Sequence, residues 1–399
     1  MKGSVISLLI VAYVGFGVSV REYHIPYVEN RKDIRIKYVF RREEDIAQFA
    51  EYEPFYPEII FTTDFKTVLD DPEINLVVVS APDKFHVPYA KQILNAGKHA
   101  LIEKPFAPTA KEAREECGKD VPILVTNVYD LQCHLLTGAN PEAMVAILEG
   151  LGVDALGLNC SLGPKEMMEP VRRLVEASSI PVIVKPNAGL PRDVDGKTVF
   201  DVGPEDFASA MKEIAELGAC VLGGCCGTTP DHIRELKKAV NGGKDTVPPY
   251  KPITYKERTI VASYTHTVQI GGGAVPVLIG ERINPTGKKK FKEALRNKDI
   301  PYIIHQGLDQ EAAGAHVLDV NVGLPEIDEK EMMVKVMTEL QGVTNLPLQL
   351  DTSSPEVMEA ALRRYNGKAL VNSVNGKQHI MDEVFPLVKK YGGVVVGLT

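Results

Sequence analysis

The stretch LGGCCGTTPDHI, residues 222 to 233, places two adjacent cysteines between glycines where an apolar strand runs into a helix. Adjacent cysteines rarely form a disulfide with each other, because the closed ring strains the peptide between them and disulfide geometry is demanding. Neither a buried apolar pair nor a pair of surface thiols needs the glycines that flank Cys225 and Cys226. Two thiolates presented by a tight turn, with a third from elsewhere, would suit a soft metal ion.

Apolar strands that end in polar residues or glycines recur on both sides of this stretch. Such strands, each followed by a helix-compatible segment, are typical of (β/α)₈ barrels, whose active sites form beyond the carboxyl ends of the strands. We therefore predict two partial TIM barrels. The expected strands are VPILVTN (121–127), ALGLNC (155–160), PVIVKPNAG (181–189) and CVLGGCCG (220–227), then VPVLIGERINP (275–285), HVLDVNVG (316–323), LPLQLD (346–351), ALVNS (369–373) and GVVVGLT (393–399).

The first 116 residues alternate strands with helices in a different pattern. Continuous apolar strands between amphipathic helices predict a parallel sheet covered on both faces, of the Rossmann type. We expect strands at Ile6–Val14, Ile36–Phe40, Ile59–Thr62, Leu76–Ser80 and Ala100–Glu103, and helices at Tyr23–Asn30, Phe65–Leu69 and Val87–Ala96. The apolar start is interpreted as a buried strand, because it lacks the small-residue cleavage site of a signal peptide.

The chain is therefore expected to be an α/β protein with three segments. A Rossmann-like domain covers 1–116, a first partial TIM barrel covers 121–240, and a second partial TIM barrel covers 260–399. Residues 241–259, rich in proline, glycine and charge, form the expected linker. The β/α units of the two partial barrels could in principle close together into one hybrid barrel. Strands from different barrels would not have matching layers of side chains in the interior, so we expect two open half-barrels instead. The alternative that VPILVTN joins the nucleotide sheet is left open.

Composition narrows the possible partners. The 399 residues carry a net charge of −8, which gives no support for a nucleic-acid or membrane partner. Six cysteines at uneven spacing do not form a disulfide framework, so we expect a reduced, cytoplasmic protein that uses thiols for metal binding or catalysis.

The third thiol of the suspected metal site is Cys160, directly after the expected strand at 155–159. Asn187 follows the next strand at the equivalent place, and Cys225 and Cys226 follow the one after it. Three thiolates and one exchangeable ligand would make a tetrahedral zinc site with one replaceable position. The alternative is that Cys160 is a small core residue and the pair merely fills a turn.

The motifs GLNCSLGP, PNAG and GGCCGTTP resemble the homocysteine S-methyltransferase family, including the homocysteine module of cobalamin-dependent methionine synthases. This resemblance, over 121–240, implies that Cys160, Cys225 and Cys226 bind zinc and that the substrate sulfur takes the fourth position. It also implies that Asn187 occupies the open position before homocysteine arrives. The resemblance covers only the second half of that family's barrel.

Acidic and amide side chains follow the expected strands of the third segment. They are Glu281, Asn284, Asp319, Asn321, Asp351 and Asn372, and a heteroaromatic ligand rich in N–H and C=O groups would require such groups. The alternative is that Asp351 and Asn372 cap the following helices. Together the motifs resemble the pterin-binding domain of methionine synthases, which implies that these residues bind 5-methyltetrahydrofolate. The match ends at Thr399, before later units of that barrel.

The first strand leads into VGFGVSVREYHIPYV, in which Gly15 and Gly17 fit a dinucleotide turn but Val20 stands at the third glycine position. Further on, the segment APDKFHVPYAKQILNAGKHALIEKP (81–105) ends in the EKP motif of Glu103, Lys104 and Pro105. This segment resembles the glucose-fructose oxidoreductase and inositol dehydrogenase family, and the resemblance covers 5–116. That resemblance implies a nicotinamide cofactor beside Lys104. Arg41 and Arg42 after the second strand would favour NADP by meeting its 2′-phosphate, unless they are ordinary surface charges.

Two of the three resemblances point to methyl transfer in methionine biosynthesis. The expected enzyme is a homocysteine S-methyltransferase that takes the methyl group of 5-methyltetrahydrofolate through cobalamin held by a partner protein. One alternative is an NAD(P)-dependent oxidoreductase, in which Lys104 would be catalytic. Another is a catalytically incomplete fusion, and open sheet edges would favour a homo-oligomer.

Overall fold

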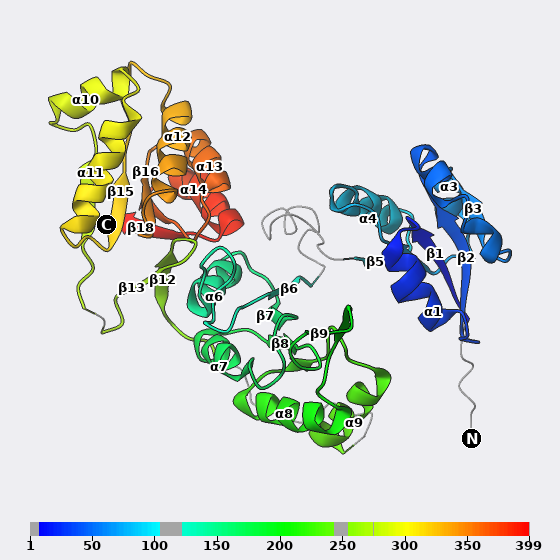
Figure 1. Ribbon diagram of the computed structural model, residues 1–399. Coiled ribbons are helices and arrows are strands. Elements are labelled where there is room, and N and C mark those ends of the chain that lie inside the picture. The colour runs from blue at the N-terminus through cyan, green and yellow to red at the C-terminus, as the bar shows by residue number, and fades with distance from the viewer. Residues whose placement is uncertain (1–7, 104–121, 243–253, 274, 399) are drawn as a thin grey trace. The chain divides into compact units, whose positions relative to one another are not determined.

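The computed structural model of the chain describes residues 8–103, 122–242, 254–273 and 275–398. Its Cα positions form two compact units, Met1–Lys119 and Asp120–Thr399 (Figure 1). Each unit is an α/β structure built on parallel sheets, which confirms the predicted fold class.

Unit 1 contains a five-stranded parallel sheet in the order β3-β2-β1-β4-β5. Its strands are β1 (Leu9–Val14), β2 (Ile34–Phe40), β3 (Ile60–Thr62), β4 (Leu76–Val79) and β5 (His99–Ile102). Alternate residues of β1 enter different cores: Ala12 and Val14 pack on one face, and Val11 and Tyr13 on the other. The sheet is therefore covered on both faces, as its continuous apolar strands predict.

The helical segments of unit 1 are short. They are η1 (Ser19–His24), α1 (Ile25–Val28), η2 (Glu43–Asp45), α2 (Ile46–Phe49), η3 (Glu53–Phe55), α3 (Phe65–Asp70), η4 (Asp83–Phe85) and α4 (His86–Asn95). The helix predicted at Tyr23–Asn30 starts earlier, with a π-helical turn, and ends at Val28. The earlier start has a packing reason. Val20, which stands at the third glycine position of the dinucleotide fingerprint, is fully buried in the core, so the helical segment begins close to the glycine turn.

Unit 2 begins with a four-stranded parallel sheet in the order β11-β8-β7-β6. Its strands are β6 (Leu124–Asn127), β7 (Ala155–Asn159), β8 (Val182–Lys185) and β11 (Val221–Leu222), with a small hairpin of β9 (Arg192–Val194) and β10 (Lys197–Val199). The helices are α6 (Pro141–Gly150), α7 (Met168–Ala177), α8 (Pro204–Leu217) and α9 (Pro230–Asn241). Because β6 pairs with β7, the segment VPILVTN does not join the nucleotide sheet.

The second half of unit 2 is a five-stranded parallel sheet in the order β14-β15-β16-β17-β18. Its strands are β14 (Ile279–Ile283), β15 (Val317–Val320), β16 (Leu348–Asp351), β17 (Leu370–Asn375) and β18 (Val394–Leu398). The helices are α10 (Lys289–Arg296), α11 (Ile300–Ala312), α12 (Glu329–Gln341), α13 (Pro355–Arg364) and α14 (Gln378–Tyr391). Apolar side chains of these helices and strands form one large core.

The two sheets of unit 2 do not join into a hybrid barrel. Among the described residues, no strand of the first sheet pairs with a strand of the second. Each sheet is therefore an open half-barrel, as expected from the mismatch between the two sets of strands.

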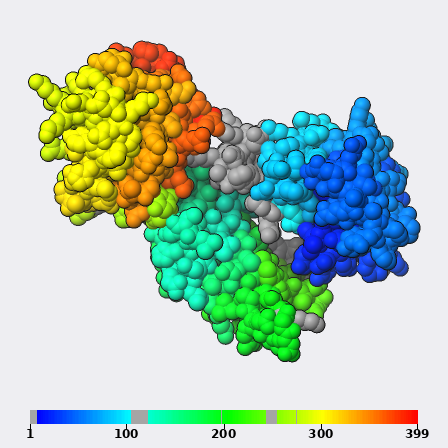
Figure 2. Space-filling model, turned by 45° about the horizontal axis from the view of Figure 1, so that its top comes forward, coloured from blue at the N-terminus to red at the C-terminus, as the bar shows by residue number. Residues whose placement is uncertain are grey.

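A β-hairpin that the sequence analysis missed connects the two halves. Strands β12 (Thr259–Ala262) and β13 (Thr267–Ile270) are antiparallel, and their Val261 and Val268 pack against the first residues of β15 and β17. Ala262 exchanges backbone hydrogen bonds with Lys368. The same hairpin contacts α6 of the first half, and the space-filling view shows the two halves in contact (Figure 2).

Two further contacts join the halves. The ammonium of Lys256 donates to the carbonyl of Val175, and Arg258 donates to the carbonyl of Ala177, so two cations satisfy the carboxyl end of α7. Gly150, at the end of α6, lies against Gly392, which ends α14 in the left-handed region. A Cβ on Gly150 would lie 2.5 Å from the Gly392 carbonyl oxygen, so the two backbones meet directly.

No helix among the described residues has the length and apolar character needed to cross a membrane.

The close approach of α6 to Gly392 predicts the effect of Gly150→Ala. Alanine normally stabilises a helix by about 1 kcal/mol relative to glycine, but here its methyl group would overlap the Gly392 carbonyl. We expect a net loss of about 1–3 kcal/mol in the free energy of unfolding of unit 2, measured by urea denaturation. Gly376→Ala is the control, because a Cβ at Gly376 meets nothing within 4 Å. Equal effects of the two substitutions would contradict this contact.

Candidate functional site

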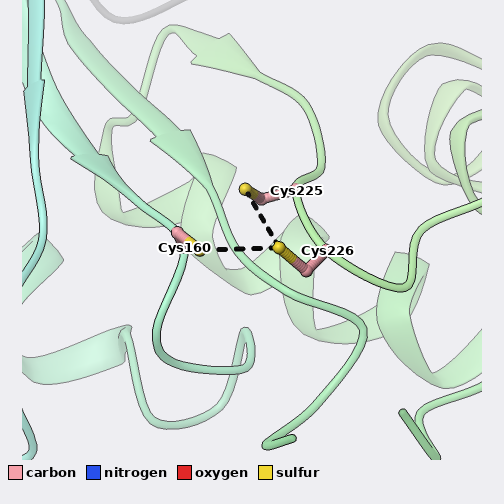
Figure 3. Close-up of side chains that lie close together, drawn as sticks. All are labelled: Cys160, Cys225 and Cys226. Atoms are coloured by element: carbon pink, nitrogen blue, oxygen red, sulfur yellow. Dashed lines mark hydrogen bonds between the residues drawn. The ribbon is translucent and has the colours of Figure 1, made fainter. Parts of the chain in front are cut away.

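Three cysteine sulfurs meet beyond the carboxyl ends of β7 and β11, the two strands that flank β8 in the first half of unit 2 (Figure 3). The Sγ atom of Cys226 lies 3.6 Å from that of Cys160 and 3.9 Å from that of Cys225. All three sulfurs lie within 4.8 Å of one another, and they are the only such group of potential ligands in the part of the chain that the structure describes.

The backbone around Cys160 turns sharply to present its thiol. Cys160 and Ser161 both adopt the left-handed conformation, with φ of 61° and 66°. This conformation is costly for residues other than glycine and is found mainly where surrounding contacts enforce it. Here the Cys160 N–H donates to the carbonyl of Lys185 at the end of β8, and the Leu162 N–H donates back to the Cys160 carbonyl. The turn therefore directs the sulfur toward the neighbouring strand end.

The turn with the adjacent cysteines is held by the loop that follows β8. The Cys225 N–H donates to the Pro186 carbonyl at 2.7 Å, and the Ala188 N–H donates to the Cys226 carbonyl at 2.9 Å. Asn187 is buried, and its Oδ1 atom accepts from the Cys226 N–H at 3.0 Å. The asparagine thus lies beside the thiols and orients one of them.

The flanking glycines are needed for close packing. Gly227 has φ of 77°, and a Cβ there would lie 2.4 Å from the ring of Phe200. The Thr228 hydroxyl donates to the Cys225 carbonyl, which closes the turn just before α9. Only a residue without a side chain fits between the turn and Phe200.

The three thiols differ in acidity. Burial acts to raise the pKa of Cys160, but hydrogen bonds from the Ser161 N–H and from the other two thiols lower it below its ordinary value. Burial and the neighbouring Cys160 sulfur raise the pKa of Cys225, and they raise that of Cys226 to about 12. Of the three thiols, Cys160 is therefore the one that ionises most readily.

The cluster has the dimensions of a tetrahedral metal site. Sulfur ligands at about 2.3 Å from a zinc ion lie about 3.8 Å apart in a tetrahedron, close to the sulfur–sulfur distances of 3.6 and 3.9 Å in the cluster. Cys226 is exposed, which leaves one side of the cluster accessible. The geometry and the donor set fit zinc with one open position.

In the second sheet, the polar residues predicted to bind a pterin line one face. Asp319 of β15 lies opposite Gln349 of β16, and Asp351 lies opposite Asn372 of β17. Asn321 donates through Nδ2 to Asp351 at 2.9 Å. These contacts join three neighbouring strand ends.

The two remaining predicted pterin residues pair with each other instead. The buried Asn284 donates through Nδ2 to Glu281 at 2.8 Å, while its Oδ1 accepts from the Thr286 N–H. Glu281 itself is mostly exposed. Glu281 lies in β14, the edge strand of the sheet, and Asn284 directly follows that strand.

Helix capping does not explain these residues. The N-cap of α13 is Ser354, whose side chain accepts from the Val357 N–H, and the N-cap of α14 is Lys377. Asp351 and Asn372 therefore do not occupy cap positions, and the capping alternative for them is wrong.

Sequence reasoning missed Gln349. It is buried, its Nε2 donates to Asp319, and its Oε1 atom has no hydrogen-bond partner. Burial raises the pKa of Asp319 to about 6, and the charges of Asp351 and Glu281 act in the same direction. The sequence did carry a signal for Gln349. Side chains alternate between the two faces of a strand, so Gln349 and Asp351, two residues apart in LPLQLD, lie on the same face.

Unit 1 has a cavity of about 250 Å³ at the carboxyl end of β1. Gly15, Gly17, Arg41 and Arg42 all line it, as a dinucleotide turn with neighbouring cations predicts. However, Arg41 is paired with Glu53, and Arg42 forms two hydrogen bonds with Asp45. A 2′-phosphate would have to compete with these carboxylates.

Glu103, the first residue of the EKP motif, follows β5 and pairs with His24 at 2.7 Å. The sequence analysis assigned no role to His24, whose ring also packs edge-on against Tyr13. Lys104 and Pro105 lie outside the described residues.

Comparison with known protein families confirms the three resemblances. Residues 88–240 match the model of homocysteine S-methyltransferases, and residues 280–398 match that of pterin binding enzymes. Residues 9–117 match the NAD-binding Rossmann fold of an oxidoreductase family. The first and third of these matches overlap over 88–117.

Two curated relatives are methionine synthases. That of Mycobacterium leprae is 35% identical over 298 residues, and that of Mycobacterium tuberculosis is 34% identical over 296 residues. Each match covers 73% of this chain and 24% of the relative, so the chain spans about a quarter of their length. Among solved structures, an oxidoreductase from Bacillus cereus is 37% identical, covering 27% of this chain and 30% of that one, with a TM-score of 0.25.

The acidity of the thiols predicts proton release on metal binding. Because Cys225 and Cys226 have raised pKa values and must lose their protons to become ligands, zinc uptake at pH 7 should release at least about two protons per ion. Metal affinity should therefore rise with pH. Calorimetry in buffers of different ionisation enthalpy measures the released protons, and an affinity that does not change between pH 6 and 8 would contradict this.

The raised pKa of Asp319 predicts a pH dependence of stability. Its folded-state pKa of about 6 lies above the ordinary value of 3.8, so its contribution is fully present below pH 4 and is lost as pH rises through 6. Asp319→Asn should stabilise unit 2 at pH 7.5 by roughly 1–3 kcal/mol and have little effect at pH 4. The exposed Asp195→Asn is the charge-matched control in urea denaturation. Equal pH dependence in both variants would rule out this role of Asp319.

Proposed function

We propose that the chain acts in methyl transfer in methionine biosynthesis, with homocysteine bound at the cysteine cluster and 5-methyltetrahydrofolate bound at the second sheet of unit 2. The observation that carries this proposal is the cluster itself. Its three sulfurs lie within 4.8 Å of one another, in a segment that matches homocysteine S-methyltransferases. The proposed class is a methionine-synthase-like homocysteine S-methyltransferase.

The proposal assigns a role to each segment of the chain. Residues 1–116 form the nucleotide-binding domain, 121–240 the homocysteine domain with its metal, and 260–399 the pterin domain. Residues 241–259 act as the linker between the last two. The matched family models support these assignments.

In the homocysteine domain, Cys160, Cys225 and Cys226 would hold a zinc ion and Asn187 would stand beside its open position. A bound zinc ion would lower the pKa of a substrate thiol so that it is present as the nucleophilic thiolate. The chain itself positions the ligands, because hydrogen bonds to Pro186 and Asn187 hold the backbone of the two adjacent cysteines. The exposed side of Cys226 offers the route by which homocysteine arrives.

In the pterin domain, Asp351, Asn372 and Asn321 would bind the ring of 5-methyltetrahydrofolate, with Asp319, Glu281 and Asn284 lining the same site. The Asn321–Asp351 hydrogen bond supports this assignment because it orients the Asp351 carboxylate. A carboxylate accepts from adjacent N–H groups of a heteroaromatic ring. Asp351 is therefore proposed as the main pterin-recognising residue.

Methyl transfer between the two sites would require cobalamin, which we place on a partner protein. The two open half-barrels give each substrate a site exposed on one side, and such sites would suit a separate carrier that visits both. We further propose a cytoplasmic location, since the five cysteines in the described residues are all free thiols.

Metal content and substrate binding test the proposal together. Purified chain should contain about one zinc ion and bind homocysteine, and Cys226→Ala should abolish both because three thiolates are needed to hold the ion. Cys220→Ala is the matched control, since Cys220 lies in the same segment and its thiol donates to the Gly218 carbonyl, outside the cluster. Zinc by mass spectrometry and homocysteine by calorimetry are the measurements. Equal zinc in both variants would contradict the site.

Pterin binding is a separate test with a separate variant. Asp351→Ala should reduce affinity for 5-methyltetrahydrofolate at least tenfold, because a charge-assisted hydrogen bond contributes about 1.5–3 kcal/mol. Fluorescence quenching measures binding, and added methylcobalamin reports transfer to homocysteine. Unchanged affinity in this variant would place the pterin elsewhere.

A second candidate function, nucleotide binding, follows from the cavity of unit 1. The cavity lined by Gly15, Gly17, Arg41 and Arg42 supports NADP as an additional cofactor of an oxidoreductase type. Arg41→Asp should then weaken NADP binding more than NAD binding in calorimetry. Absence of binding of either nucleotide by the wild type would leave unit 1 as a scaffold.

A further inference from the structure

His232, in the first turn of α9, is the residue of the cysteine motif for which the proposed function has no role. Its ring is buried, with 6% of its surface exposed, and it packs edge-on against Phe207. Nδ1 lies 3.1 Å from the backbone nitrogen of Thr229, and Nε2 lies 2.9 Å from the Val202 carbonyl oxygen. Because an N–H can only donate, Nδ1 must accept and Nε2 must carry the proton that is donated to Val202.

The two nitrogens serve different parts of the structure. The Nδ1 contact completes a capping box with Thr229 at the start of α9, which is a local role. The Nε2 contact crosses to the loop between β10 and α8, thirty residues earlier in the chain. Capping the helix does not require that second contact.

A continuous series of hydrogen bonds leads from Val202 to the thiol cluster. The Val202 N–H donates to the Ala188 carbonyl at 3.0 Å, and the Ala188 N–H donates to the Cys226 carbonyl at 2.9 Å. Asn187, next to Ala188, accepts from the Cys226 N–H. The loop that orients Cys226 is thus tied to His232 through Val202. Phe200 from the same loop lies against Gly227.

We propose that His232 is a positioning residue for the metal-binding cluster: its Nε2–H bond to Val202 holds the loop at 187–202 against the turn that carries Cys225 and Cys226. This inference rests on the proposed metal site. Metal–ligand distances tolerate errors of only about 0.2 Å, so a small displacement of Cys226 lowers affinity. Partners of this kind, which act through the ligands, typically change metal affinity about 10–100-fold.

Two nearly isosteric substitutions separate positioning from capping. Both His232→Gln and His232→Glu can accept from the Thr229 N–H, since glutamine and glutamate are the usual third-position residues of a capping box. Only the glutamine amide can also donate to the Val202 carbonyl, because an ionised carboxylate has no donor. The glutamate adds a negative charge near the cluster, which by itself would favour a cation.

Cobalt(II) alone is the probe, because thiolate-to-cobalt absorption reports the geometry of the ligands. We expect His232→Gln to bind Co²⁺ within about threefold of the wild type, and His232→Glu to bind about tenfold more weakly with an altered spectrum. His316→Gln is the control, because His316 also accepts from a backbone N–H, that of Leu278, but lies in the pterin half. Equal affinity and spectra of the Gln and Glu variants would overturn the proposal.

The free energy of unfolding of each metal-free variant completes the test. If affinity for Co²⁺ merely follows stability across the variants, His232 is a structural residue and the proposal is wrong. Failure of the wild type to bind Co²⁺ would instead count against the metal site. In that case amide hydrogen exchange of Ala188 and Cys226 in the metal-free chain decides: faster exchange in His232→Glu than in His232→Gln supports positioning, and equal exchange overturns it.

Discussion

The hydrogen bonds between the loop after β8 and the turn at Cys225 and Cys226 are the interaction on which the site depends. They join two strand ends that are about 40 residues apart in sequence, and they bring the adjacent thiols to a third, at Cys160. A parallel sheet places the carboxyl ends of its strands along one edge, but the edge alone does not fix sulfur positions to within a few tenths of an ångström. The backbone N–H groups of Cys225 and Cys226 restrain the turn further by donating to the Pro186 carbonyl and to Asn187 Oδ1. The chemistry proposed for this site follows from that restraint.

The sequence predicted most of the parallel strands and the meeting of the three cysteines, because apolar runs that end in polar residues carry strong local signals. It missed the β12–β13 hairpin, because residues 241–259 were expected to form the linker and the first strand of the third segment was expected only from residue 275. It also missed Gln349 and His232, whose importance depends on partners in other strands or loops. Such long-range pairings cannot be derived from local patterns. The capping alternative for Asp351 and Asn372 could be decided only by the positions of the actual caps.

The two halves of unit 2 are separate sheets held together by a few specific contacts. The β12–β13 hairpin packs against the first residues of β15 and β17 in the second half, and it also contacts α6 of the first half. Gly150 of the first half lies directly against the backbone of Gly392 in the second. Each half therefore builds its site from its own strands, and the joint between them is made of backbone contacts and helix-end cations. The cysteine cluster and the pterin-type residues therefore belong to different sheets.

Zinc K-edge X-ray absorption of the zinc-loaded chain, with and without homocysteine, tests the central claim most directly. The account predicts three sulfur ligands at about 2.3 Å from the ion, and a fourth when homocysteine is added. A first shell made of nitrogen and oxygen, or a sulfur count that homocysteine does not change, would contradict it.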